Sequence, residues 1–349
     1  MPYPKEEPNW SSKNQFLEKL YDVNKSLYKQ NKYYEKEPKN CLLCDAKKIT
    51  RGDFKLNNTI WEDGLTHYIE KHNIKPSEEF IDQIYNFETN NNSRILKVNG
   101  TMYKMNDLKY LKLDRNQIMI MDALMKHGGY RKKYIDPKNK DVYRYSEHAG
   151  LIDFNNDTIE KIIISGKTNR VDQGDEEIYL PKNIPEAYDY EYIFHTHPPT
   201  PKPGGRVNIG ILYEFPSISD IFHFIDHYND GNTQGSLVVA PEGLYNIRPL
   251  HLKKKKIKIN EDSLYKNLSK LMHSIQSDAI KKYGTEFSTF TFYSKIAQDL
   301  TYINMINDLL KKFNIRIDFF PREKDTLGNW IIDTLYLPIF VTEPIHKNM

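Results

Sequence analysis

Two histidines separated by one residue stand at the end of an apolar run, in the stretch E-Y-I-F-H-T-H-P-P of residues 191–199. Residues i and i+2 of a β-strand point to the same side of a sheet, so His195 and His197 can converge on one metal ion. Pro198 and Pro199 then end regular strand pairing. Two imidazoles predict a zinc site, which needs a third protein ligand and, if catalytic, a fourth position for water.

Candidates for the remaining groups lie on both sides of this pair. Downstream, P-S-I-S-D begins a predicted helix on which Ser217 and Asp220, at i and i+3, share one face. Upstream, Glu147 begins a predicted strand just before Ala149 and Gly150. Each residue also has an ordinary interpretation: unligated strand histidines, a serine N-cap, a first-turn aspartate favoured by the helix dipole, and a solvent-facing glutamate.

In combination, E-x-A-G-L, H-T-H-P and S-x-x-D resemble the motif of the JAMM (MPN+, JAB-domain) zinc metalloproteases, a family that includes deubiquitinating isopeptidases. The resemblance covers about residues 113–250. It implies an α/β (α+β) fold with a cytidine-deaminase-like mixed β-sheet flanked by helices. It also implies a hydrolase that cleaves an isopeptide or peptide bond.

The resemblance assigns a role to each candidate. His195, His197 and Asp220 would hold one catalytic Zn²⁺. Glu147 would act as general base, and Ser217 would donate a hydrogen bond to the developing oxyanion. These roles agree with general zinc chemistry, in which the ion acidifies water and polarises a carbonyl group.

One feature departs from the family pattern. Eighteen residues, 199–216, separate Pro198 from Ser217, more than is usual in the family. We interpret them as an insertion, a loop at the mouth of the site that selects substrate or covers the zinc. His223 and His227 follow Asp220 at i+3 and i+7; a packed or solvated helix face is the simpler interpretation, and support of the metal ligands is the alternative.

The chain's only cysteines form a second set of candidate ligands. Cys41 and Cys44 precede His67 and His72 in a C-x2-C-x22-H-x4-H pattern. A C-x2-C turn supplies two thiolates, and H-x4-H on a helix supplies two imidazoles, so the set predicts a closed structural Zn²⁺ site. The alternative is two unligated thiols and two surface histidines.

Composition excludes several classes of protein. Of 349 residues, 39% are hydrophobic and 28% are charged, as in a globular chain rather than a disordered one. The net charge of +3 is too balanced to predict nucleic-acid binding. We find neither an apolar run long enough to span a membrane nor a signal-peptide pattern, and expect an intracellular, cytoplasmic protein.

Local patterns suggest how the chain is organised. Helices are expected over 11–35, 115–127, 264–275 and 288–313 and from Ser217, with strands over 149–154, 159–165 and 190–195, and Asn99-Gly100 predicts a hairpin. We divide the chain into an N-terminal tail and helix (1–37), a CCHH zinc-binding module (38–92), a hairpin connector (93–112), a JAMM/MPN metalloprotease domain (113–252) and a helical C-terminal extension (253–349).

Three functions compete at this level. The leading hypothesis is a zinc metallo-isopeptidase acting on ubiquitin or ubiquitin-like conjugates, with protein partners bound through the zinc module and the C-terminal extension. The second keeps the MPN fold but not catalysis and makes the chain a scaffold. The third, a nucleic-acid-binding zinc protein acting through Lys253–Lys256 and the cysteine module, is the weakest.

Overall fold

The computed structural model describes residues 10–87, 94–98, 101–128, 146–155, 158–165, 169–170, 190–199, 207, 210–231, 233–251 and 256–344. These residues form a mixed α/β structure that divides into two compact units. Unit 1 comprises residues 1–112, 323–329 and 335–349, and unit 2 comprises 113–322 and 330–334. No helix within the described ranges is both long and apolar enough to cross a membrane.

The elements of unit 1 are α1 (Lys13–Lys29), β1 (Tyr33–Lys39), β2 (Thr50–Leu56), β3 (Thr59–Glu62), α2 (Leu65–His72), α3 (Glu78–Tyr85), β4 (Arg94–Val98), β5 (Thr101–Leu113), β14 (Glu323–Lys324) and β16 (Leu335–Pro344). Those of unit 2 are α4 (Arg115–Gly128), β6 (Ser146–Glu147), β7 (Ala149–Asn155), β8 (Thr158–Ile164), β9 (Asn169–Arg170), β10 (Tyr192–Thr196), α5 (Ile218–Asp230), β11 (Gly235–Val239), β12 (Gly243–Pro249), α6 (Glu261–Tyr283), α7 (Thr289–Thr291), the π-helix η4 (Phe292–Ile296), α8 (Thr301–Leu310), the 3-10 helix η5 (Lys311–Phe313), β13 (Ile315–Pro321) and β15 (Trp330–Ile331).

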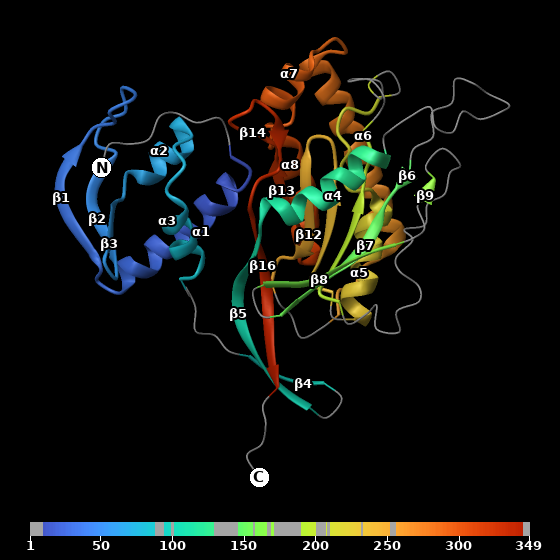
Figure 1. The fold of residues 1–349 in the computed structure, drawn as a ribbon, viewed down its shortest axis with the longest axis horizontal. Helices are drawn as coiled ribbons and strands as arrows, with labels where there is room; N and C mark the ends of the chain where they lie inside the picture. Colours follow the sequence, from blue (N-terminus) through green and yellow to red (C-terminus); the bar gives the residue numbers. More distant parts are fainter. Residues whose placement is uncertain are drawn as a thin grey trace. The chain divides into compact units, whose positions relative to one another are not determined.

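Unit 1 is built around the apolar stripe of α1. Its helical period places Phe16, Leu20, Val23 and Leu27 on one face, and all four are fully buried. This face contacts α2, α3 and β2 of the antiparallel sheet β1-β2-β3. A second sheet has the order β16-β5-β4 (Figure 1), and its β4–β5 pair is the expected hairpin, whose turn residues lie outside the described ranges.

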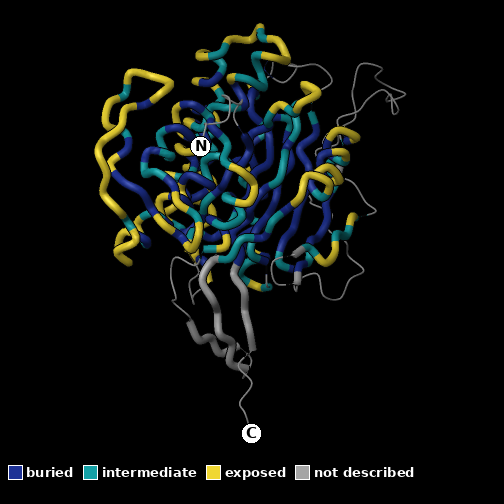
Figure 2. Tube along the Cα trace, turned by 60° about the vertical axis from the view of Figure 1, so that its left-hand side comes forward, coloured by how far each residue is buried: buried dark blue, intermediate teal, exposed yellow. Residues whose placement is uncertain are grey.

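A six-stranded sheet with the order β13-β12-β11-β10-β7-β8 forms the centre of unit 2. Only β10 and β11 run parallel, and the other neighbours are antiparallel. Every residue of β10 and β11 is buried, as the near-continuous apolar runs of these strands predict for strands covered on both faces (Figure 2). Helix α4 contacts β10 and β11, and α5 contacts β11 and β12.

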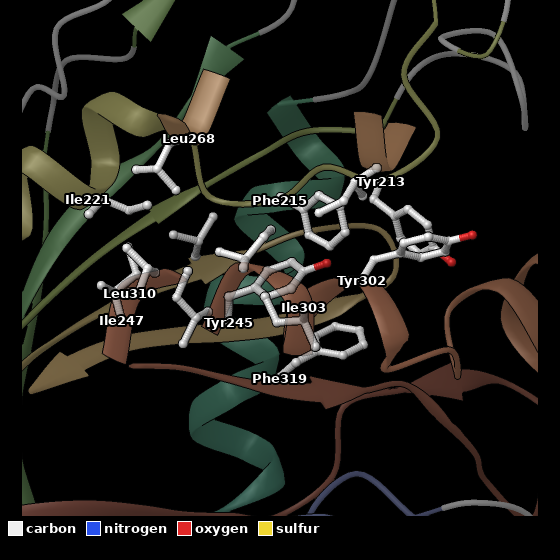
Figure 3. Close-up of a cluster of buried hydrophobic side chains, with 14 of the residues drawn as sticks. Tyr213, Phe215, Ile221, Tyr245, Ile247, Leu268, Tyr302, Ile303, Leu310 and Phe319 are labelled. Atoms are coloured by element: carbon white, nitrogen blue, oxygen red, sulfur yellow. The ribbon is translucent and has the colours of Figure 1, made fainter. Parts of the chain in front are cut away.

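The main core of unit 2 lies between this sheet and helices α5, α6 and α8. Val238, Tyr245 and Ile317 reach it from the strands, and Ile221 and Leu268 from the helices. Figure 3 shows this cluster, including the aromatic rings of residues 213, 215, 245, 302 and 319. Val238 of β11 packs in the same cluster as Ile221 of α5, so the face of the sheet that carries Val238 is the one covered by α5. The neighbouring residues of the strand point to the opposite face.

The C-terminal residues do not form a separate extension. Strand β13 pairs with β12 along its whole length, from Gly243 opposite Pro321 to Pro249 opposite Ile315. Helices α6 and α8 contribute to the same core as α5. The boundary expected at residue 253 is therefore not a division of the fold, because residues 113–322 form one compact unit. Likewise, residues 93–112 group with the N-terminal residues rather than standing as a connector.

Two neighbouring carboxyl groups lead to a prediction about stability: Glu191, just before β10, and Asp153 of β7. Burial and a hydrogen bond with Asp153 raise the pKa of Glu191 to about 8. The folded state then holds a proton that the unfolded chain has released, so the free energy of unfolding falls as the pH rises from about 4.5 to about 8. Because Glu191 is only partly buried, we expect Glu191→Gln to recover about 1–2 kcal/mol at pH 8 and above.

Urea unfolding of both proteins at pH 5 and pH 8.5 measures this difference. Glu160→Gln, the same change at an exposed position of β8, is the matched control. Equal pH dependence in wild type and Glu191→Gln would contradict the assignment.

Candidate functional site: two clusters of metal-ligand residues

Strand β10 positions both histidines of the first cluster. His195 is opposite Val238 of β11, and paired residues of neighbouring strands share a face, so the His195 side chain lies on the face covered by α5. His197 follows the strand by one residue, and its N–H still donates to the Val239 carbonyl at 2.8 Å, which extends the alternation. His195 and His197 are both buried.

Helix α5 begins next to these histidines. Ser217 is its N-cap, and a reciprocal capping box forms: the Asp220 N–H donates to Ser217 Oγ at 3.1 Å and the Ser217 N–H donates to Asp220 Oδ2 at 2.6 Å. The cap fixes the rotamer of Asp220, which is only 5% exposed. The ordinary interpretation of Ser217 as an N-cap is confirmed, and the same cap orients Asp220 beside the histidines.

Four atoms of three side chains lie close together. His195 Nε2 lies 3.1 Å from Asp220 Oδ1 and 3.2 Å from His197 Nε2, and His197 Nε2 lies 3.3 Å from Asp220 Oδ2. Zinc–nitrogen and zinc–oxygen bonds of about 2.0–2.1 Å in a tetrahedron require ligand atoms about 3.3–3.4 Å apart. The observed distances are close to that requirement, with one carboxylate oxygen of Asp220 facing each histidine.

Electrostatics couple the three residues in the metal-free chain. Burial raises the pKa of Asp220, but the charges and hydrogen bonds of the two histidines hold it well below its usual value. Burial lowers the pKa of His197, but the hydrogen bond and charge of Asp220 raise it to about 10. A positive charge is thus favoured at this point, and a metal ion that binds here must displace the imidazolium proton.

Glu147 is placed by the antiparallel pairing of β7 and β10. Ala149 is opposite His195, and Thr196 and His148 then exchange two hydrogen bonds: Thr196 N–H to the His148 carbonyl and His148 N–H to Thr196 Oγ1, both at 2.9 Å. Continuing the register by one residue sets Glu147 opposite His197. Its carboxylate is close enough for its charge to raise the pKa of His197.

The last part of the expected insertion lies in the core rather than at the mouth of the site. Leu212, Tyr213 and Phe215 are buried, and Gln276 of α6 accepts hydrogen bonds from Leu212 N–H and Tyr213 N–H at 2.8 and 3.2 Å. The Tyr213 hydroxyl donates to the Ile296 carbonyl at 2.8 Å. Residues 200–206, 208 and 209, which belong to the same expected loop, lie outside the described ranges.

This anchored segment contacts the first cluster directly. His197 Nδ1 lies 3.1 Å from the carbonyl oxygen of Glu214 and donates to it, so Nε2 is the nitrogen that can coordinate a metal ion once its proton has left. Glu214 N–H in turn donates to Oε1 of the buried Glu242 at 2.6 Å. The sequence offered no signal for this arrangement, because a backbone carbonyl has no residue type and A-P-E-G reads as an ordinary turn.

Four further histidines are not part of the cluster. The rings of His223 and His227, both on α5, lie with their centroids 4.5 Å apart and their planes tilted by 44°. Burial, together with the charges of His227 and His195, lowers the pKa of His223 to about 4, so it is neutral at pH 7. His148 pairs with His127, with ring centroids 5.6 Å apart. The packed helix face expected for residues 223 and 227 agrees with this burial.

The second cluster lies in unit 1 and contains all four predicted ligands. Cys41 Sγ is 3.3 Å from His72 Nε2, Cys44 Sγ is 3.5 Å from His67 Nε2, and all four ligand atoms lie within 4.8 Å of one another. A zinc tetrahedron places sulfur and nitrogen ligands about 3.6 Å apart. The turn between β1 and β2 supplies the thiols and α2 supplies the imidazoles, so the cluster fits a closed metal site.

Neighbouring groups prepare Cys41 to act as a thiolate. Leu43 N–H donates to Cys41 Sγ at 3.4 Å, and Leu42 N–H donates to the Tyr68 hydroxyl at 3.0 Å. Burial raises the pKa of the Cys41 thiol, but hydrogen bonds from Leu43 and Cys44 bring it below its usual value. The thiolate is the form that binds metal.

Comparison with known proteins finds a relative in a virus but neither a protein-family model nor a solved structure. No protein-family model matches the chain, and no solved structure matches it. An uncharacterized protein of Acanthamoeba polyphaga mimivirus is 34% identical over 315 residues, which cover 88% of this chain and 86% of the relative.

Proposed function

We propose that this chain, which belongs to the same family as the mimivirus protein, is a zinc-dependent metallo-isopeptidase of the JAMM type. The observation that carries the proposal is the convergence of side-chain atoms of His195, His197 and Asp220, with the charge of Glu147 acting on His197. Its substrates would be ubiquitin or ubiquitin-like conjugates. The ion in each cluster would be Zn²⁺, catalytic in unit 2 and structural in unit 1.

The residues at the first cluster would have different roles in amide hydrolysis. Two imidazoles and one carboxylate would hold Zn²⁺, which when bound supplies a Lewis acid that acidifies water and polarises a carbonyl group. Glu147 is not one of the three converging groups, and in this proposal its carboxylate takes a proton from the attacking water and returns it to the leaving amine. Proton transfer of this kind contributes about 10²–10⁴-fold to a rate.

Ser217 would stabilise the oxyanion. The residue is exposed, and its oxygen accepts the Asp220 N–H through a lone pair, so the hydroxyl proton is not consumed by the cap. Because the cap holds the serine at the start of α5, its hydroxyl is fixed beside the ligand that Asp220 supplies. A donor fixed before reaction is more effective than one that must reorient.

Metal content tests the cluster before any substrate is known. Wild-type protein is expected to bind two Zn²⁺ per chain, and Asp220→Ala is expected to bind one, because two histidines alone leave the site short of a ligand. Elemental analysis measures both. Asp226→Ala, an exposed aspartate of the same helix, is the matched control and should retain two. An unchanged zinc content in Asp220→Ala would remove the ligand assignment.

Activity is tested on purified wild-type protein with ubiquitin dimers of different linkages, ubiquitin-like conjugates and an unstructured peptide. Isopeptide cleavage that a zinc chelator stops and Asp220→Ala lacks would support the proposal. Zinc binding without cleavage of any of these substrates would favour the scaffold hypothesis instead.

A further inference from the structure

Glu242 is a buried carboxyl group beside the first cluster that the proposed mechanism does not use. It is 0% exposed and stands in the turn between β11 and β12. Its Oε1 accepts hydrogen bonds from Glu214 N–H at 2.6 Å and from the Tyr245 hydroxyl at 2.8 Å. Burying a carboxyl group is costly unless it is well hydrogen-bonded, so a position like this needs a structural or functional reason.

The turn that carries Glu242 is itself held in place. The guanidinium group of Arg322 donates to the carbonyls of Ala240 and Pro241 and to Asp122 of α4, and the Arg322 N–H donates to the Glu242 carbonyl at 3.2 Å. Arg322 is 1% exposed. Glu242 is therefore a fixed point rather than a flexible side chain.

The Glu214 peptide connects this fixed point to a metal ligand. Its N–H donates to Glu242, and its carbonyl accepts the Nδ1–H of His197 at 3.1 Å. The same segment leads within three residues to the N-cap of α5 and then to Asp220. One carboxyl group thus constrains the tautomer of His197 and the start of the helix that supplies the third ligand.

We propose that Glu242 is a positioning residue that sets the metal affinity of the His195, His197 and Asp220 cluster through the Glu214 backbone. The inference rests on the proposed metal site but not on isopeptidase activity. Groups that orient a ligating histidine in this way typically change metal affinity by about 10–100-fold when they are removed. This positioning role requires only that the Oε1 atom of residue 242 accepts the Glu214 N–H. The amide oxygen of a glutamine can also accept this hydrogen bond.

Variants of the full-length protein separate this role from general packing. Glu242→Leu is expected to weaken metal binding at this cluster by about 10–100-fold, Glu242→Gln to stay near wild type, and Glu242→Asp, whose shorter side chain retreats from Glu214, to fall between them. Ile247→Ala is the matched control, since Ile247 is equally buried on β12 but has no polar link to the cluster. It should lower the free energy of unfolding, because it leaves a cavity in the core, and leave metal affinity unchanged.

Titration with Co²⁺, followed by competition with Zn²⁺, measures the metal affinity of each cluster separately. The two are distinguished because only the cysteine cluster gives thiolate-to-Co²⁺ charge-transfer absorption. Wild-type affinity in both Glu242→Leu and Glu242→Asp would overturn the inference, as would equal losses in Glu242→Leu and Ile247→Ala. If Glu242→Leu fails to fold, Glu242→Asp decides. If the variants bind metal in the expected order but the wild-type protein cleaves no isopeptide bond, the proposed function is rejected and the positioning role is retained. If the wild-type protein binds no metal at this cluster, both are rejected.

Discussion

Glu147→Gln is expected to retain both zinc ions and to lose about 10²–10⁴-fold in the rate of isopeptide hydrolysis. Asp220 and the two histidines supply the converging atoms, so the metal does not depend on Glu147. The amide keeps the shape of the carboxylate but cannot accept a proton from water. Single-turnover hydrolysis and elemental analysis on the same preparation measure the two halves of the prediction.

Two comparisons keep this result interpretable. Glu160→Gln makes the same chemical change on exposed β8 and should keep wild-type activity. Loss of zinc from Glu147→Gln would show that Glu147 is a ligand, and retention of both zinc and full activity would show that another group is the base. Either result would refute the assigned role.

Cys44→Ser is expected to release the proposed zinc ion of unit 1 and to unfold the metal-binding turn. Structural zinc contributes about 10–16 kcal/mol of apparent binding free energy in small zinc-finger peptides. Here the apolar contacts around the cluster are few: Cys41, Tyr68 and Ile74 form its buried group, with two further side chains packed against it. Without the metal, little else orders residues 40–49, whereas α2 is also held by Ile69 in the larger core of unit 1.

The rest of unit 1 should stay folded. A separate aromatic and aliphatic cluster joins α1, β2, β3, α2 and α3 without using the metal ligands; it includes Phe16, Phe54, Trp61, Ile69 and Tyr85. Residues 38–92 therefore do not have a large core of their own. The core that they contribute to also contains side chains of α1 and Tyr336 of β16.

Hydrogen exchange read by peptide measures the extent of unfolding. In Cys44→Ser, amides of residues 40–49 should exchange faster, while those of α1 and β2 remain protected. Leu43→Ala, an exposed neighbour in the same turn, should behave like wild type and bind two zinc ions. Unchanged protection of residues 40–49 in zinc-depleted Cys44→Ser would show that the metal is not structural.

Much of the candidate chemistry was predictable from local sequence. The H-x-H pair at the end of an apolar run, the serine and aspartate at a helix start, and C-x2-C with H-x4-H each depend on short-range geometry. Strand alternation, the capping box and the helical period act over a few residues, so these spacings determine which side chains share a face. The structure brings His195, His197 and Asp220 together, and likewise the four residues of the cysteine cluster.

Other features depended on contacts between distant segments. The residues after Lys256 read as a helical extension, yet β13 completes the central sheet, because strand partners are chosen by the edge left open in the fold rather than by sequence distance. Residues 211–216 read as a surface loop, yet Gln276 and the core of unit 2 bury them. Pro- and Gly-rich composition upstream gave no indication of that anchor.

The sequence by itself determined the ligand types and their local spacing, because these follow from backbone periodicities within one strand or helix. The tertiary structure alone decided that the charge of Glu147 acts on His197 and that Glu242 reaches the cluster through the Glu214 peptide. Both depend on the register between separate strands and on the fixed turn at β11–β12. The two hydrogen bonds of the Glu214 peptide join residues 17 and 28 positions apart in the chain, separations over which no local pattern carries information.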